Sequence, residues 1–113
     1  DLAFNNRVTF MADGSSQKGI DAQTWLLETF ADAKFMAPGH GSVQTKPFPM
    51  VTKTRAYMQR LRDEMEKAVD EGMELQTAVD NTPFEDWKSV NMYGLNHKKN
   101  VDFVYREMEI EGF

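Results

Sequence analysis

The strongest constraint on the fold is a helical repeat of apolar side chains in the second half of the chain. Between Val51 and about Glu71, apolar residues recur at helical spacing, and Gly72 stands where such a helix would end. The repeating positions are Tyr57, Leu61, Met65, Ala68 and Val69. A helix with one apolar face must bury that face against other elements. The pattern therefore predicts that residues 51–113 form a packed helical region.

Further helices are predicted after Gly72. Residues 74–79 favour a short helix, and Asn96 to about Glu109 favours a longer one with Val101, Val104, Tyr105 and Met108 on one face. Between them, Thr82-Pro83-Phe84-Glu85 has the pattern of a capping box with proline at the first helical position. We expect one more short helix to start there.

Residues 1–50 mix strand and helix patterns. Leu2–Phe4 and Arg7–Phe10 are typical of strand edges, with Asn5-Asn6 as a turn or bulge between them. Apolar spacing from about Lys18 to Ala31 predicts a helix with one buried face, and 34–37 is typical of a short buried strand. Strand, helix and strand in this order predict a crossover onto a sheet, hence an α/β layer. The chain divides near Pro47 to Pro49, into residues 1–50 and 51–113.

Composition excludes several classes of function. The 113 residues include no cysteine, which excludes disulfides, thiolate metal sites and cysteine nucleophiles. The net charge is −5, the sequence has no basic patch, and basic residues do not alternate with aromatic ones. Nucleic acid is therefore a poor candidate partner. No run approaches the roughly 20 apolar residues that a membrane span requires. The eight methionines and eight phenylalanines are expected to be packing residues, some at a contact with a partner outside this chain.

The turn Pro38-Gly39-His40-Gly41 is the strongest chemical signal. It follows the strand predicted at 34–37, and its glycines let the backbone turn sharply while the imidazole projects from the strand end. A neutral imidazole there is a natural zinc ligand. Asp1 stands at another predicted strand edge, and a carboxylate with an imidazole suits zinc, manganese or iron. From the turn alone, a structural histidine bonded to a backbone carbonyl is slightly favoured.

Two segments together resemble a known family. Asp1-Leu2-Ala3-Phe4, followed after a helix by 34–41, resembles the last two metal-binding motifs of the metallo-β-lactamase fold. In that family a Gly-Asp-hydrophobic-Phe segment gives an aspartate that bridges two metals, and a Pro-Gly-His-Gly turn gives the last histidine of the second metal. Thr52 to Met73 is similar to the helix after that histidine in quinoprotein relay system zinc metallohydrolases. The segments 84–87 and 100–105 occur there in similar order, so the resemblance covers nearly the whole chain.

The resemblance implies a fold, a chemistry and a site. The fold would be α/β, the C-terminal portion of a metallo-β-lactamase αββα sandwich, followed by a mostly helical tail. The chemistry would be that of a hydrolase with a two-zinc site (manganese or iron are the other candidates). A metal-bound hydroxide would attack an ester-, thioester- or lactam-like small molecule. Asp1 and His40 would bind metal, and Asn6 and Arg7 could line the substrate pocket.

The resemblance also implies a partner. The family's His-x-His-x-Asp-His motif is absent from this sequence, and the first residue is Asp1 rather than methionine. We therefore expect the remaining ligands to come from a missing N-terminal half of the same protein or from a complementary chain. The fragment alone is expected to be inactive.

A different class of function remains open. The chain could be a metal-free helical binding or scaffolding module, in which His40 is only a turn residue. The second histidine, His97, matches no ligand motif and precedes two lysines at a predicted helix start. It is expected to be solvated or to cap that helix.

Overall fold

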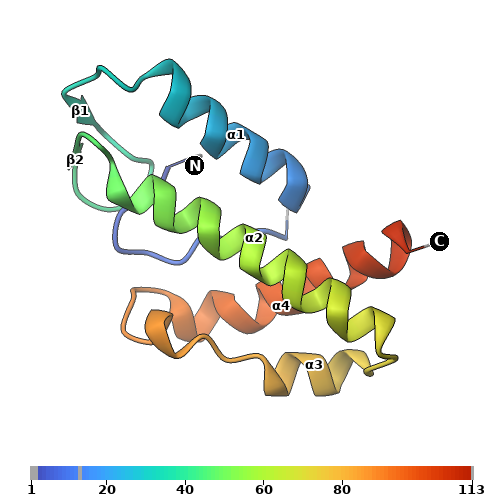
Figure 1. The fold of residues 1–113 in the computed structure, drawn as a ribbon. Coiled ribbons are helices and arrows are strands. Elements are labelled where there is room, and N and C mark those ends of the chain that lie inside the picture. Colours follow the sequence, from blue (N-terminus) through green and yellow to red (C-terminus); the bar gives the residue numbers. More distant parts are fainter. Residues whose placement is uncertain (1–2, 13, 113) are drawn as a thin grey trace.

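The protein is largely helical (Figure 1). The computed structural model describes residues 3–12 and 14–112. In chain order the elements are α1 (Ser16–Thr29), β1 (Phe35–Met36), β2 (Gln44–Thr45), α2 (Pro49–Asp70), α3 (Leu75–Asn81), the 3₁₀ turn η1 (Glu85–Trp87) and α4 (Tyr93–Glu111). Helix α2 lies in the middle, with α1 on one side, α4 on the other, and α3 packed on α4 (Figure 1). Among the described helices, none is long and apolar enough to cross a membrane.

The helices predicted from apolar spacing are confirmed, with small shifts at their ends. The end of α2 follows the predicted glycine. Gly72 has φ +73°, and its N–H bonds to the carbonyl of Val69, while the N–H of Met73 bonds to the carbonyl of Ala68. This pair of bonds is a Schellman motif, and its left-handed position favours glycine because a side chain there is strained.

The expected αββα sandwich is wrong. Within the described residues, the only strands are β1 and β2, which pair antiparallel as a hairpin with Phe35 opposite Thr45. The strand after α1 therefore pairs with the segment that follows it, and the predicted crossover onto a sheet is reduced to an isolated parallel bridge between Phe4 and His40. The strand expected at 34–37 is also not buried, since Phe35 is 68% exposed. What agrees with the prediction is the mostly helical region after residue 50.

Side-chain amides of α4 explain why the segment at 7–10 does not join a sheet. The carbonyl of Val8 accepts a hydrogen bond from Nδ2 of Asn96 at 3.0 Å. The carbonyl of Thr9 accepts from Nδ2 of Asn100 at 2.7 Å, and Oδ1 of Asn100 accepts from the N–H of Met11 at 2.9 Å. Buried backbone groups must be paired, and here a helix supplies the partners that a neighbouring strand would otherwise supply.

One apolar core joins α2, α3 and α4 to the N-terminal segment. Its most deeply buried members include Val8, Tyr57, Leu61, Met65, Ala78, Phe84, Val101 and Val104. The packing role expected for methionine and phenylalanine is confirmed for several of them. Phe10, Phe30 and Phe35 remain exposed on the described surface.

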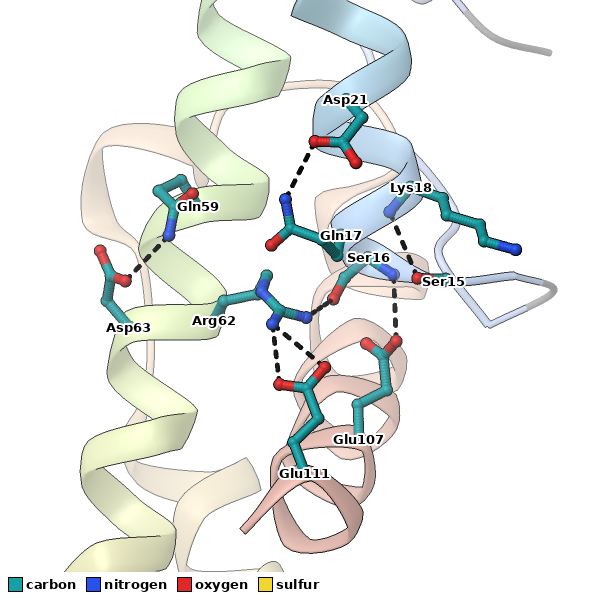
Figure 2. Close-up of polar contacts among 10 residues, drawn as sticks. All are labelled: Ser15, Ser16, Gln17, Lys18, Asp21, Gln59, Arg62, Asp63, Glu107 and Glu111. Atoms are coloured by element: carbon teal, nitrogen blue, oxygen red, sulfur yellow. Dashed lines mark hydrogen bonds and ion pairs between the residues drawn. The ribbon is translucent and has the colours of Figure 1, made fainter.

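The first turn of α1 is fixed to the other long helices (Figure 2). Glu107 of α4 accepts a hydrogen bond from the N–H of Ser16 at 3.0 Å, which places a carboxylate at the positive end of the α1 dipole. Arg62 of α2 donates to Oγ of Ser16 at 2.7 Å and forms an ion pair with Glu111 at 2.8 Å. These contacts hold α1 beside α2 and near the C-terminal end of α4.

His97 is buried, so the expectation of a solvated or capping histidine is wrong. The residue is 3% exposed, with Nε2 2.7 Å from the carbonyl of Thr82 and Nδ1 2.8 Å from the hydroxyl of Tyr57. A carbonyl only accepts, so Nε2 carries the proton and Nδ1 accepts from Tyr57. The position lies four residues before Val101, on the apolar face of α4. The neighbouring residues Lys98 and Lys99 are exposed on another side of α4, so their charge does not predict whether His97 is buried.

The capping box expected at Thr82 to Glu85 does not form. The hydroxyl of Thr82 donates to the carbonyl of Ala78 at 2.7 Å, so it closes α3 and does not open the next helix. The helix that follows is a single 3₁₀ turn beginning at Glu85, without a side-chain cap. The predicted short helix is therefore present, but it starts at Glu85 and has no side-chain cap.

The free energy of unfolding should fall as pH decreases from about 7 to about 5.5, above the titration range of ordinary carboxylates. Burial is the largest cause that lowers the pKa of His97 below 6.5. In this range the unfolded chain binds a proton that the folded chain resists. The contribution of neutral His97 is thus complete above 6.5 and is lost as pH falls toward the lowered pKa. Urea denaturation at successive pH values measures this slope.

The control for this slope is His97→Gln. Glutamine can still donate to a carbonyl but does not titrate, so the slope should become shallower even though the variant is less stable. A slope that His97→Gln leaves unchanged would assign the pH dependence to other groups.

Candidate functional site

The histidine turn lies against the N-terminal segment of the chain. The backbone of Phe4 forms a parallel bridge with that of His40. The N–H of Gly39 donates to the carbonyl of Ala3 at 3.2 Å, and the N–H of Asn5 donates to the carbonyl of His40 at 3.1 Å. The structure therefore brings the segment that follows Asp1 in sequence beside the His40 turn. Asp1 itself lies outside the described residues.

The close approach of these two segments requires a glycine. Gly41 has φ +93°, and a Cβ built on it would overlap the carbonyl oxygen of Asn5. Two side chains add to the pairing: Nδ2 of Asn5 donates to the carbonyl of Ser42 at 2.9 Å, and Nε2 of Gln44 donates to the carbonyl of Phe4 at 3.1 Å. The turn is therefore held by backbone and side-chain bonds together.

The imidazole of His40 contacts two side chains of the N-terminal segment. Its ring stacks on that of Phe4, with centroids 5.6 Å apart and planes 6° from parallel. Nη1 of Arg7 lies 3.0 Å from Nδ1 of His40. A guanidinium only donates, so Nδ1 accepts this bond, and in a neutral ring the proton sits on Nε2. Arg7 thus fixes both the orientation and the tautomer of the imidazole.

A complete metal site does not fit the described residues by themselves. Across residues 3–12 and 14–112, no three His, Asp or Glu side chains gather closely enough to hold a metal ion. A ligating histidine normally donates its second ring N–H to an acceptor, whereas Nδ1 of His40 receives a bond from Arg7. Metal binding by His40 therefore requires further ligands and a new position for Arg7.

The two residues predicted to line a substrate pocket lie in different surroundings. Arg7 is half-buried and faces His40. Asn6 is exposed, has φ +52°, and lines a hollow of about 350 Å³ between α2 and the loop after η1. The hollow is formed by Asn6, Met50, Lys53, Ala56, Asp86, Trp87 and Val90.

Most of this hollow carries no signal in the sequence. Met50, Lys53 and Ala56 recur three residues apart, which indicates one face of α2 but not what covers it. The loop after η1 reaches this face because the carbonyl of Asn91 accepts a bond from the N–H of Val8 at 2.8 Å. That pairing of distant segments has no local pattern from which it could have been predicted.

Comparison of the chain with protein-family models, with curated proteins and with solved structures gives no match. The resemblance to the metallo-β-lactamase fold therefore stays a prediction from the motifs.

Replacing Gly41 by alanine should separate the two segments. The added methyl group meets the Asn5 carbonyl and also strains a left-handed backbone position, which together should cost about 2 kcal/mol or more. Thermal and urea denaturation measure the loss. The matched control is Gly14→Ala, because a Cβ at Gly14 meets no atom within 4 Å. Equal stability of the two variants would show that the close approach at Gly41 is absent in solution.

Proposed function

We propose that this chain carries part of the metal site of a zinc-dependent hydrolase that acts on an ester-, thioester- or lactam-like small molecule. The observation that supports it is the parallel pairing of Phe4 with His40. The sequence predicts one metal ligand in each of the two paired segments. Ala3, two positions after Asp1 in the sequence, bonds directly to Gly39, the neighbour of His40.

In this proposal Asp1 and His40 are ligands, with manganese or iron as the other candidate metals. Further ligands come from an N-terminal half of the same protein or from a complementary chain. Arg7 orients His40 in the metal-free chain. The substrate lies on the side of the N-terminal segment that carries Asn6, where the hollow opens.

Exposed aromatic side chains support the presence of a partner. Trp25 and Phe30, near the end of α1, contact each other edge to face at 5.4 Å and are 53% and 44% exposed. Phe35, in β1, and Val43, directly before β2, are also exposed. Exposed aromatic side chains that contact each other, as Trp25 and Phe30 do, are typical of surfaces that contact another protein. A second protein segment would cover them.

A metal-free helical binding or scaffolding module is the second candidate. The observation that favours it is the bond from Arg7 to Nδ1 of His40, because it gives the histidine a structural role without any metal. In this case the exposed aromatic side chains would be the binding surface, and the His40 turn would only hold the N-terminal segment.

Zinc titration of the purified chain separates the two candidates. We expect weak zinc binding by calorimetry, with at least about tenfold lower affinity in His40→Ala and in Asp1→Asn, since each removes a ligand. The matched control is Asp32→Asn, an exposed aspartate in the loop after α1, which should bind zinc like the unchanged chain.

Circular dichroism confirms that each variant is folded before titration. Equal zinc affinity in all four proteins, or no zinc binding in any of them, would contradict the hydrolase proposal and leave the metal-free module.

A further inference from the structure

The hollow beside Asn6 has an apolar floor. Trp87 is 8% exposed, and Met50 and Val90 are half-buried against the core. Asn6, Lys53 and Ala56 are exposed at its rim. A volume of about 350 Å³ is in the range of sites that hold small organic molecules. The floor suits a flat apolar group about the size of one aromatic ring.

The charges at the rim favour an anion. Asp86 is paired with Arg60 at 2.8 Å, and this hydrogen bond holds the pKa of Asp86 below its usual value. Arg60 is itself fixed, because its guanidinium lies 3.8 Å from the centre of the Phe84 ring. The negative charge of Asp86 is therefore compensated.

Lys53 supplies the remaining charge. Among the described residues, the ammonium group of Lys53 has no hydrogen-bond or ion-pair partner. The charged residues that line the hollow are Lys53 and Asp86, and Asp86 is already paired with Arg60, which lies outside the lining. Lys53 is therefore the charge that is left for a ligand, on a chain whose total is −5. An ammonium group that keeps all three donors available is suited to bind a carboxylate.

Asn6 adds a neutral polar group. Its backbone is left-handed, with φ +52°, a conformation that asparagine tolerates better than most residues. Its amide can donate to one oxygen of a ligand and accept from another group. Arg7, the next residue, contacts His40, so a single peptide unit links the hollow to the candidate metal site.

We infer that this hollow binds a small aryl carboxylate, with the ring against Trp87 and the carboxylate between Lys53 and Asn6. Identifying this ligand as the acyl part of the substrate or product rests on the proposed function, since hydrolysis of an ester, thioester or lactam releases a carboxylate. The affinity for an aryl carboxylate itself rests only on the floor and rim of the hollow.

Tryptophan fluorescence in a Trp25→Phe background tests the inference, because Trp87 is then the only tryptophan. Benzoate, added at constant ionic strength, should change the Trp87 emission saturably. Benzyl alcohol has the ring without the carboxylate, and acetate has the carboxylate without the ring. Each should bind at least about tenfold more weakly than benzoate.

Lys53→Gln in the same background should weaken benzoate about tenfold through loss of the charge-assisted bond. Lys18→Gln is the matched control, since Lys18 is exposed on α1 and does not line the hollow. No saturable response to benzoate, or an equal response in Lys53→Gln, would overturn the inference. Equal binding of benzyl alcohol would also overturn it, because the carboxylate would then contribute nothing.

The titration contains no metal, so its outcome is independent of the zinc experiment. Benzoate binding together with absent zinc binding would keep the hollow as a ligand site and reject the hydrolase. Zinc binding without benzoate binding would keep the hydrolase proposal and reject the hollow as a ligand site.

Discussion

A buried chain of hydrogen bonds through His97 holds the rest of the molecule in place. Tyr57 donates to His97, His97 donates to the carbonyl of Thr82, and Asn100 donates to both Tyr57 and the carbonyl of Thr9. Burial raises the pKa of Tyr57 and lowers that of His97, so both side chains are neutral at pH 7. Leaving one such buried group unpaired costs about 1–3 kcal/mol. These hydrogen bonds therefore join α2, α4, the end of α3 and the N-terminal segment as one unit.

The position of the candidate site follows from this arrangement. Asn96 and Asn100 hold residues 8–11 on α4. Residues 3–5, which continue the same segment, pair with the His40 turn. The helical core thus places the histidine turn through a short stretch of backbone. The aryl carboxylate hollow lies along that stretch, so the core also sets the distance between the hollow and His40.

Features that depend on the local spacing of residues could be predicted from the sequence. Features that depend on contacts between residues far apart in the chain could not. The helices are long and periodic, and Gly72 marks the end of α2, so both were predictable. The alternation at residues 7–10 is typical of a strand, yet asparagine side chains from a helix satisfy its backbone, and the αββα sandwich does not form. For the candidate site, the sequence singles out the His40 turn and Asn6, and the functional roles of both stay predictions. The roles of Lys53 and Trp87 arise from tertiary packing and have no local pattern.

Hydrogen exchange of individual amides in Asn100→Ala most directly tests whether the helical core positions the His40 turn. If the core positions the turn, the amide of Met11, which bonds to Asn100, and the amide of Asn5, which bonds to His40, both lose protection, while the middle of α2 remains protected. Asn81→Ala is the control, because Asn81 is exposed and bonds only within α3. Full protection of the Asn5 amide in Asn100→Ala would show that the His40 turn is held independently of the helical core.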